Sequence, residues 1–320
     1  MEKLILYIFK NNNSIFIINM EGLANLGATC AINSLIQILY RINKFKYIIL
    51  NSNTPENTLT YELKDLFNVI ISNPNKSITP KKFITNFFNI FKNIFTKFEE
   101  NDICELYLFI IQKIHEENTY NISFNNNIDT NNYIYKIANI NNFKYSPIYD
   151  LFQGIYMHSI NCLNCNYINT TYEPFIYLNL NIVPNQSIND LFINQYLSNN
   201  EYRKKDDWKC DKCNSNCEYV KNTSIIKFPE IIIIILNRFT DTTNKNNKPI
   251  NINKHLSIIK NYNLQSIAFH HGILDAGHYN AISKSNDDLY YLYDDLNVHN
   301  ISNIDNVLIN NTNSYLLCYL

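Results

Sequence analysis

One stretch of the chain reads Gly22-Leu-Ala-Asn-Leu-Gly-Ala-Thr-Cys30 and continues as Ala31-Ile-Asn-Ser-Leu-Ile-Gln-Ile-Leu39. Apolar residues recur at helical spacing in its second half, whereas its first half contains two glycines and predicts a loop. Cys30 therefore lies where a loop becomes a helix, and free N–H groups at a helix start lower the pKa of a thiol and can hold an oxyanion. A cysteine in this place is either a nucleophile or a small core residue, and a partner base decides between them.

A candidate base lies near the end of the chain, in two alternating segments that flank turn-forming residues. These segments are Gly277-His278-Tyr-Asn-Ala-Ile-Ser283 and Leu289-Tyr-Tyr-Leu-Tyr-Asp294-Asp295. They predict a β-hairpin centred near Asn286, in which His278 and Asp294 are equidistant from the centre and face one another. We expect Asp294 to accept the Nδ1–H of His278 and to orient the imidazole.

Together these residues predict thiol chemistry. His278 would take the proton of Cys30, and the amide of Asn25, on the loop before the helix, would donate to the oxyanion that develops on a carbonyl substrate. Without Cys30, the His–Asp pair would be read as an incidental exposed polar pair of a hairpin.

Two Cys-x-x-Cys pairs stand out among the eight cysteines: Cys162, Cys165, Cys210 and Cys213. Four thiolates from two such pairs complete a closed tetrahedral zinc site, which is structural because it leaves no open position. Free or disulfide-bonded cysteines are the alternative. Cys217 could replace one ligand, whereas Cys104 and Cys318 are expected in the core.

Composition places limits on the remaining function classes. The chain has 320 residues, 46% of them hydrophobic, and a formal net charge of −1. It can therefore fill a sizeable core, and its charge implies no general attraction to nucleic acid or to an anionic membrane. No apolar run approaches the roughly 18 to 20 residues of a membrane-spanning helix. We expect a cytoplasmic protein, with the nucleus, or a host cell if the source is viral, as further locations.

The periodicity changes along the chain. Residues 30 to about 142 carry helical patterns, such as the apolar stripe from Ile103 to Ile114, while the part after about residue 147 is rich in β-branched and aromatic runs. The sequence predicts an α+β protein with a helical first part and a mainly β second part.

These motifs, in this order, resemble the ubiquitin-specific proteases, a family of papain-like cysteine deubiquitinases. The family's cysteine box matches residues 22–37 and its histidine box matches residues 277–295. Between them, Leu151–Gly154 and Leu236–Phe239 also follow the family's order. The resemblance covers about residues 20–320 as one catalytic domain, and residues 1–19 are expected to be an N-terminal extension.

The resemblance implies a hand-like fold with a helical thumb over about residues 20–145, and a β palm and zinc-bearing β fingers over about residues 146–320. The implied site residues are Cys30 as nucleophile, His278 as base, Asp294 as orienting acid, Asn25 as oxyanion donor, and Cys162, Cys165, Cys210 and Cys213 as ligands of a structural Zn²⁺. The implied activity is hydrolysis of the bond after the C-terminal glycine of ubiquitin, by a monomer that binds ubiquitin and ubiquitinated proteins but neither nucleic acid nor membranes. The alternatives are a ubiquitin-binding pseudoenzyme, a protease for a ubiquitin-like modifier, and a zinc-stabilised interaction module.

Two acidic residues match positions that in relatives contact the basic C-terminal tail of ubiquitin. Asp102 and Glu105 lie one helical turn apart and could jointly receive arginines. The alternative is an acidic first turn that the helix dipole favours. Residues 271–277 are expected to form a mobile loop over the cleft, and Ala31 departs from the family, where an aromatic residue usually follows the nucleophile.

Overall fold

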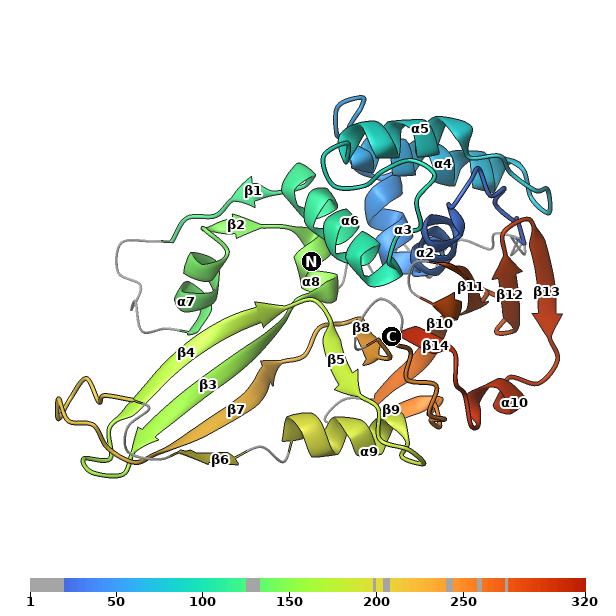
Figure 1. The fold of residues 1–320 in the computed structure, drawn as a ribbon. Coiled ribbons are helices and arrows are strands. Elements are labelled where there is room, and N and C mark those ends of the chain that lie inside the picture. Colours follow the sequence, from blue (N-terminus) through green and yellow to red (C-terminus); the bar gives the residue numbers. More distant parts are fainter. Residues whose placement is uncertain are drawn as a thin grey trace.

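The computed structural model describes residues 20–124, 133–197, 200–203, 208–239, 244–257, 261–273 and 276–320. The expected N-terminal extension, residues 1–19, lies outside these ranges. Helices gather in the first part of the chain and strands in the second, as the sequence predicts (Figure 1). Across the described ranges, no helix combines the length and the apolar character needed to cross a bilayer.

In the described part of the chain, the thumb contains the helices α2 (Cys30–Tyr40), α3 (Asn43–Leu50), α4 (Leu59–Ser72), α5 (Lys81–Ile90) and α6 (Ile103–Glu117). Every residue of α2 is buried, because α3 and α6 pack on one side of it and strands of the palm on the other. The predicted apolar stripe of α6 is buried as expected, and it faces α2 and α4. The nucleophile candidate therefore begins the central helix of the molecule.

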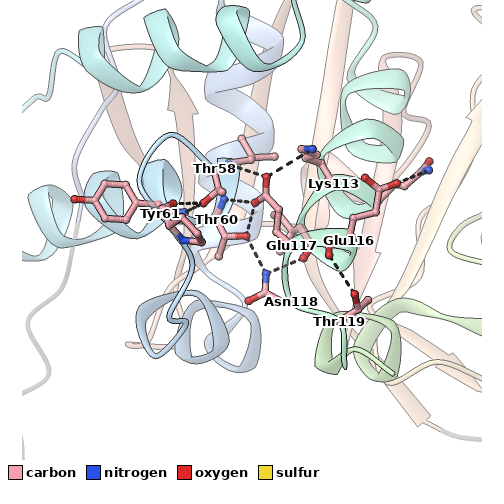
Figure 2. A network of polar contacts seen from close by, with 12 residues as sticks. Thr58, Thr60, Tyr61, Lys113, Glu116, Glu117, Asn118 and Thr119 are labelled. Carbon is pink, nitrogen blue, oxygen red and sulfur yellow. Dashed lines mark hydrogen bonds and ion pairs between the residues drawn. The ribbon is translucent and has the colours of Figure 1, made fainter. Parts of the chain in front are cut away.

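The end of α6 holds the start of α4 (Figure 2). The carboxylate of Glu117 accepts hydrogen bonds from the backbone N–H groups of Leu59 and Thr60, at 3.0 and 2.8 Å, and from the Thr60 hydroxyl at 2.8 Å. The amide of Asn118 donates to the same hydroxyl at 2.9 Å. Glu117 thus satisfies N–H groups that the first turn of α4 leaves without helical partners.

The fingers are a four-stranded antiparallel sheet of order β4-β3-β7-β6. Its strands are β3 (Gly154–Cys162), β4 (Ile168–Phe175), β6 (Asn200–Arg203) and β7 (Tyr219–Lys227). The three longest reach away from the rest of the molecule, towards the lower left of Figure 1. A short pair, β1 (Tyr120–Asn121) with β2 (Lys144–Tyr145), and the helices α7 (Tyr133–Ile140) and α8 (Pro147–Phe152) connect the thumb to the fingers.

The palm is a larger sheet of order β13-β12-β11-β10-β14-β8-β5, with β9 paired to β10. Its strands are β5 (Leu178–Asn181), β8 (Ile232–Asn237), β9 (His255–Ser257), β10 (Asn261–Ile273), β11 (Ala276–Lys284), β12 (Tyr290–Asp294), β13 (Asn297–Ile301) and β14 (Ser314–Tyr319). Side chains alternate between two cores. Ile233 and Ile235 join the core shared with the thumb, whereas Ile232 and Ile234 join the core on the opposite face. That second core also contains residues of α9 (Ile188–Phe192), which the π-helix η1 (Ile193–Leu197) continues, and of α10 (Asp305–Leu308).

A buried arginine ties loops of the palm together. Arg238 is fully buried, and its guanidinium donates to the backbone carbonyls of Ser314, Asn246, Lys248 and Asn311. Burial lowers the pKa of this guanidinium to about 10. The arginine of the Leu236–Phe239 motif thus has a structural role in this fold.

Candidate active site and metal centre

Cys30 is the first residue of α2, as predicted, and only 5% of it is exposed. The preceding loop turns through Gly27 and Ala28, whose φ angles are +94° and +51°. The side-chain oxygen of Asn25 accepts hydrogen bonds from the N–H groups of Gly27 and Thr29, both at 3.1 Å. The loop therefore folds around Asn25 and presents Cys30 at its end.

His278 and Asp294 meet on the palm, with 2.5 Å between Nε2 of the histidine and Oδ1 of the aspartate. The predicted ring nitrogen was wrong, because the bond to Asp294 uses Nε2 and leaves Nδ1 outside this pair. The predicted register was also wrong. The last pair before the turn is Lys284 with Tyr290, so the turn spans residues 285–289 and the hairpin centre moves to Asp287.

This register places Asn280, rather than His278, opposite Asp294. The shift arises because the predicted strand residue Leu289 belongs to the turn, where its carbonyl accepts the N–H of Ser285 at 2.8 Å. The two catalytic candidates are diagonal neighbours on one face of the sheet, and diagonal pairs are within reach of long side chains.

The surroundings of Cys30 raise the pKa of its thiol. Burial is the largest cause, and the charges of Asp295 and Glu100 act in the same direction, while backbone hydrogen bonds from Tyr279 and Ala31 oppose them. The expectation of a lowered pKa at the helix start is therefore wrong, because burial outweighs the helix terminus. The contact with Tyr279 places the thiol beside the residue that follows His278.

Asp295 joins the cysteine loop to the histidine hairpin, a role that the sequence reasoning missed. Its Oδ2 accepts from the amide of Asn25 at 3.0 Å and its Oδ1 from the amide of Asn33 at 2.8 Å. Its backbone carbonyl accepts the N–H of Leu23 at 2.8 Å. Asn25 keeps a second amide N–H, which fits the predicted role of an oxyanion donor. The sequence signal for this role was the pair of adjacent acids, Asp294 and Asp295, at the end of the histidine box.

Asp102 has partners on both carboxylate oxygens. As the N-cap of α6 it accepts the N–H groups of Cys104 and Glu105 through Oδ1, at 2.7 and 3.1 Å. Its Oδ2 accepts the hydroxyls of Tyr315 and Tyr279, at 2.7 and 3.4 Å. This geometry favours the capping alternative for Asp102 and leaves Glu105 as the exposed carboxylate of the pair. A joint contact of the two acids with a basic tail stays a prediction.

The structure brings the two Cys-x-x-Cys pairs together at the far end of the fingers. The sulfur atoms of Cys162, Cys165, Cys210 and Cys213 all lie within 4.8 Å of one another. The two turns are alike. Asn166 and Asn214, each four residues after the first cysteine of its pair, have left-handed φ angles of +55° and +56° and donate their N–H groups to the carbonyls of Cys162 and Cys210. A closed set of four thiolates on two matched turns fits a structural metal ion.

Cys217 lies closer to this cluster than the sequence suggested. Its sulfur is 3.2 Å from that of Cys162, whereas the sulfur of Cys213 is 3.9 Å from the same atom. Cys217 lies two residues before β7, and the backbone carbonyl of its neighbour Glu218 accepts the N–H of Leu163 at 3.0 Å. The pairing of β3 with β7 therefore delivers a fifth thiol to the site.

A cysteine at the start of a buried helix, together with a His–Asp pair on the neighbouring sheet, is typical of papain-like cysteine hydrolases. Comparison with known proteins names the family. The ubiquitin carboxyl-terminal hydrolase family profile matches residues 21–319, and the chain belongs to this family.

Individual relatives are only moderately similar to this chain in sequence. The chain is 31% identical over 239 residues to ubiquitin carboxyl-terminal hydrolase 4 of Arabidopsis thaliana, a match that covers 68% of this chain and 64% of the relative. It is 25% identical over 311 residues to ubiquitin carboxyl-terminal hydrolase 2 of Homo sapiens, covering 83% and 49%. The chain thus spans about half to two-thirds of the length of these relatives.

Solved structures share the fold. The SAGA Ubp8/Sgf11/Sus1/Sgf73 DUB module bound to ubiquitin aldehyde contains a chain that matches with a TM-score of 0.73 and 22% identity, over 99% of this chain and 73% of that one. The expected α+β hand with helical thumb, β palm and β fingers is confirmed by this likeness.

Proposed function

We propose that the chain is a cysteine-type deubiquitinase, which hydrolyses the isopeptide or peptide bond after the C-terminal glycine of ubiquitin. The observation that carries the proposal is the meeting of the Cys30 helix start with the hairpin that presents the His278–Asp294 pair. Family membership supports it, and so does the shared fold with a module that was solved with ubiquitin aldehyde.

We propose a part for each residue. His278 takes the thiol proton through Nδ1, and the thiolate of Cys30 attacks the glycyl carbonyl carbon. Asn25 donates its free amide N–H to the oxyanion, while Asp294 stabilises the imidazolium through Nε2. His278 then protonates the leaving lysine amine. A thioester remains, and water activated by His278 hydrolyses it to free ubiquitin and the thiol.

Removal of the nucleophile tests the proposal. We expect Cys30→Ala to abolish release of a fluorophore from the C-terminus of ubiquitin while ubiquitin binding persists, because the substitution removes only a small buried thiol. Cys104→Ala, which removes a buried thiol from α6, is the matched control and should keep its turnover. Wild-type turnover of Cys30→Ala would contradict the assignment, and binding of ubiquitin without any turnover by the intact chain would favour a pseudoenzyme.

We further propose that Cys162, Cys165, Cys210 and Cys213 bind a structural Zn²⁺. Four thiolates with this spacing suit zinc, and the closed set is distant in the fold from the active site. We expect one zinc per chain by elemental analysis, and loss of that zinc with a lower unfolding temperature in Cys210→Ser. Cys217→Ser should keep its zinc. If Cys217→Ser lost the metal and Cys213→Ser kept it, Cys217 would be the fourth ligand.

The remaining expectations concern the assembly. The solved module contains further subunits, whereas we propose that this chain acts on ubiquitin as a monomer. Absence of turnover by the purified chain, with recovery on addition of a partner, would contradict this part of the proposal.

A further inference from the structure

The segment before α6 reaches from the thumb onto the loop of the nucleophile. Phe98 has a left-handed φ of +65° and is 74% exposed. A Cβ on Gly27 would lie 2.7 Å from Cδ1 of this ring, so Phe98 rests directly on the turn that precedes Cys30. An aromatic residue rarely takes this backbone conformation, and contacts around it must hold it there.

Two residues further on, the same segment contacts the palm. The carboxylate of Glu100 accepts a hydrogen bond from the backbone N–H of Gly277 at 2.6 Å. Gly277 directly precedes His278 and pairs with Gly272 across the β10–β11 hairpin. The expectation of a loop over residues 271–277 is corrected here, because residues 271–273 and 276–277 continue the two paired strands and only residues 274–275 lie outside the described ranges.

The backbone of Gly277 is closely packed and cannot move away from the Glu100 carboxylate. A Cβ at this position would lie 2.2 Å from Nε2 of His270, which is fully buried beneath it against Phe239 and Tyr279. The backbone of Gly277 is therefore held between a buried ring on the palm side and the Glu100 carboxylate on the thumb side. A hydrogen bond to a carboxylate is stronger than one between neutral groups.

The same carboxylate acts on the nucleophile. The charges of Glu100, from the thumb, and Asp295, from the turn after β12, both disfavour the thiolate of Cys30. Asp102 also lies close by, where its carboxylate accepts the hydroxyls of Tyr279 and Tyr315, and His278 pairs with Asp294. Glu100 thus contacts the residue before the base and opposes ionisation of the nucleophile.

We propose that Glu100 is a positioning residue that latches the thumb to the palm beside Cys30. Its carboxylate holds the backbone of Gly277, the residue before the base, and places a negative charge near the nucleophile.

Three variants separate the hydrogen bond from the charge. Glu100→Gln keeps an acceptor for the N–H of Gly277 but loses the charge, whereas Glu100→Ala loses both. Glu99→Gln removes the neighbouring exposed carboxylate and is the matched control. Two quantities are measured without ubiquitin: the pH profile of Cys30 alkylation by iodoacetamide, followed by peptide mass spectrometry, and the hydrogen exchange rate of the Gly277 amide, followed by NMR.

We expect the alkylation profile to move to lower pH in both Glu100 variants, so that the rate at pH 7 rises severalfold, because the removed charge disfavours the thiolate. Exchange at Gly277 should accelerate more than about tenfold in Glu100→Ala, stay close to wild type in Glu100→Gln and be unchanged in Glu99→Gln. Unchanged alkylation in both Glu100 variants, or unchanged exchange in Glu100→Ala, would overturn the proposal. Because neither readout uses ubiquitin, these results stand apart from the outcome of the deubiquitinase assay.

Discussion

At the scale of single residues, Asp295 organises the active site although it is not one of the three residues that carry out proton transfer and attack. It accepts the amides of Asn25 and Asn33 on its two carboxylate oxygens. Asn33 also donates to the carbonyl of Leu23 at 3.2 Å. Asp295 therefore orients Asn25, the proposed oxyanion donor, from the turn after β12.

Loss of this carboxylate should weaken catalysis more than folding. We expect Asp295→Ala to lower kcat by about 10- to 100-fold, because the removal of one oriented oxyanion donor costs about that much or more. KM for a ubiquitin substrate and the unfolding temperature should change little. Asp288→Ala, in the exposed turn of the same hairpin, is the control. Steady-state kinetics measure both kcat and KM. An unchanged kcat in Asp295→Ala would show that Asn25 does not need the Asp295 carboxylate.

The sequence identified Cys30, His278, Asp294 and Asn25 because each stands in a local pattern of loop, helix or alternating strand. It did not identify the roles of Asp295 and Glu100, since these depend on contacts between segments 270 and 177 residues apart. The predicted register of the hairpin was wrong for a local reason. Leu289 is apolar and continues the alternating strand pattern, although it belongs to the turn.

At the scale of elements, the helices of the thumb depend on contacts at their ends as well as on their apolar faces. Glu117 at the end of α6 accepts hydrogen bonds from the first turn of α4, and its side chain is only 8% exposed. The apolar stripe of α6 was predictable from spacing, whereas this bridge was not, because its partners are 57 and 58 residues away.

The bridge should contribute measurably to stability. Glu117→Ala leaves the N–H groups of Leu59 and Thr60 without their acceptor, and we expect the free energy of unfolding to fall by about 1 to 3 kcal/mol. Glu116→Ala, which loses only an exposed bond to Gln112, is the matched control and should change it by less than about 0.5 kcal/mol. Urea unfolding followed by circular dichroism measures both. Equal stabilities of the two variants would show that α4 does not depend on the bridge.

At the scale of the whole molecule, two buried histidines link folding to pH. His115 stacks on Tyr149 with 3.4 Å between ring centroids, and His270 packs among aromatic rings of the palm. Burial lowers the pKa of each imidazole to about 4 from an ordinary value near 6.5. Both are therefore neutral in the folded protein under conditions where the unfolded chain already binds protons.

The sign of the pH effect follows from linkage. Above about pH 6.5 neither state protonates these histidines, and their stabilising effect is complete. As the pH falls towards 4 the unfolded state binds protons first, so stability falls, by at most about 3 kcal/mol for each histidine. We expect the free energy of unfolding to be lower at pH 5 than at pH 7.5, and the difference to shrink in His115→Phe, which keeps a stacked ring. The same pH dependence in wild type and variant would contradict this account.

The central claim is that Cys30, activated by His278, attacks the C-terminal carbonyl of ubiquitin. The most direct measurement is the reaction of the purified chain with ubiquitin that carries a thiol-reactive electrophile in place of its C-terminal carboxylate, followed by intact-mass and peptide mass spectrometry. The account predicts one covalently attached ubiquitin per chain, located on Cys30, no adduct in Cys30→Ala and a much slower reaction in His278→Ala. No adduct with the wild-type chain, an adduct on another cysteine, or preferential reaction with a ubiquitin-like modifier would contradict it.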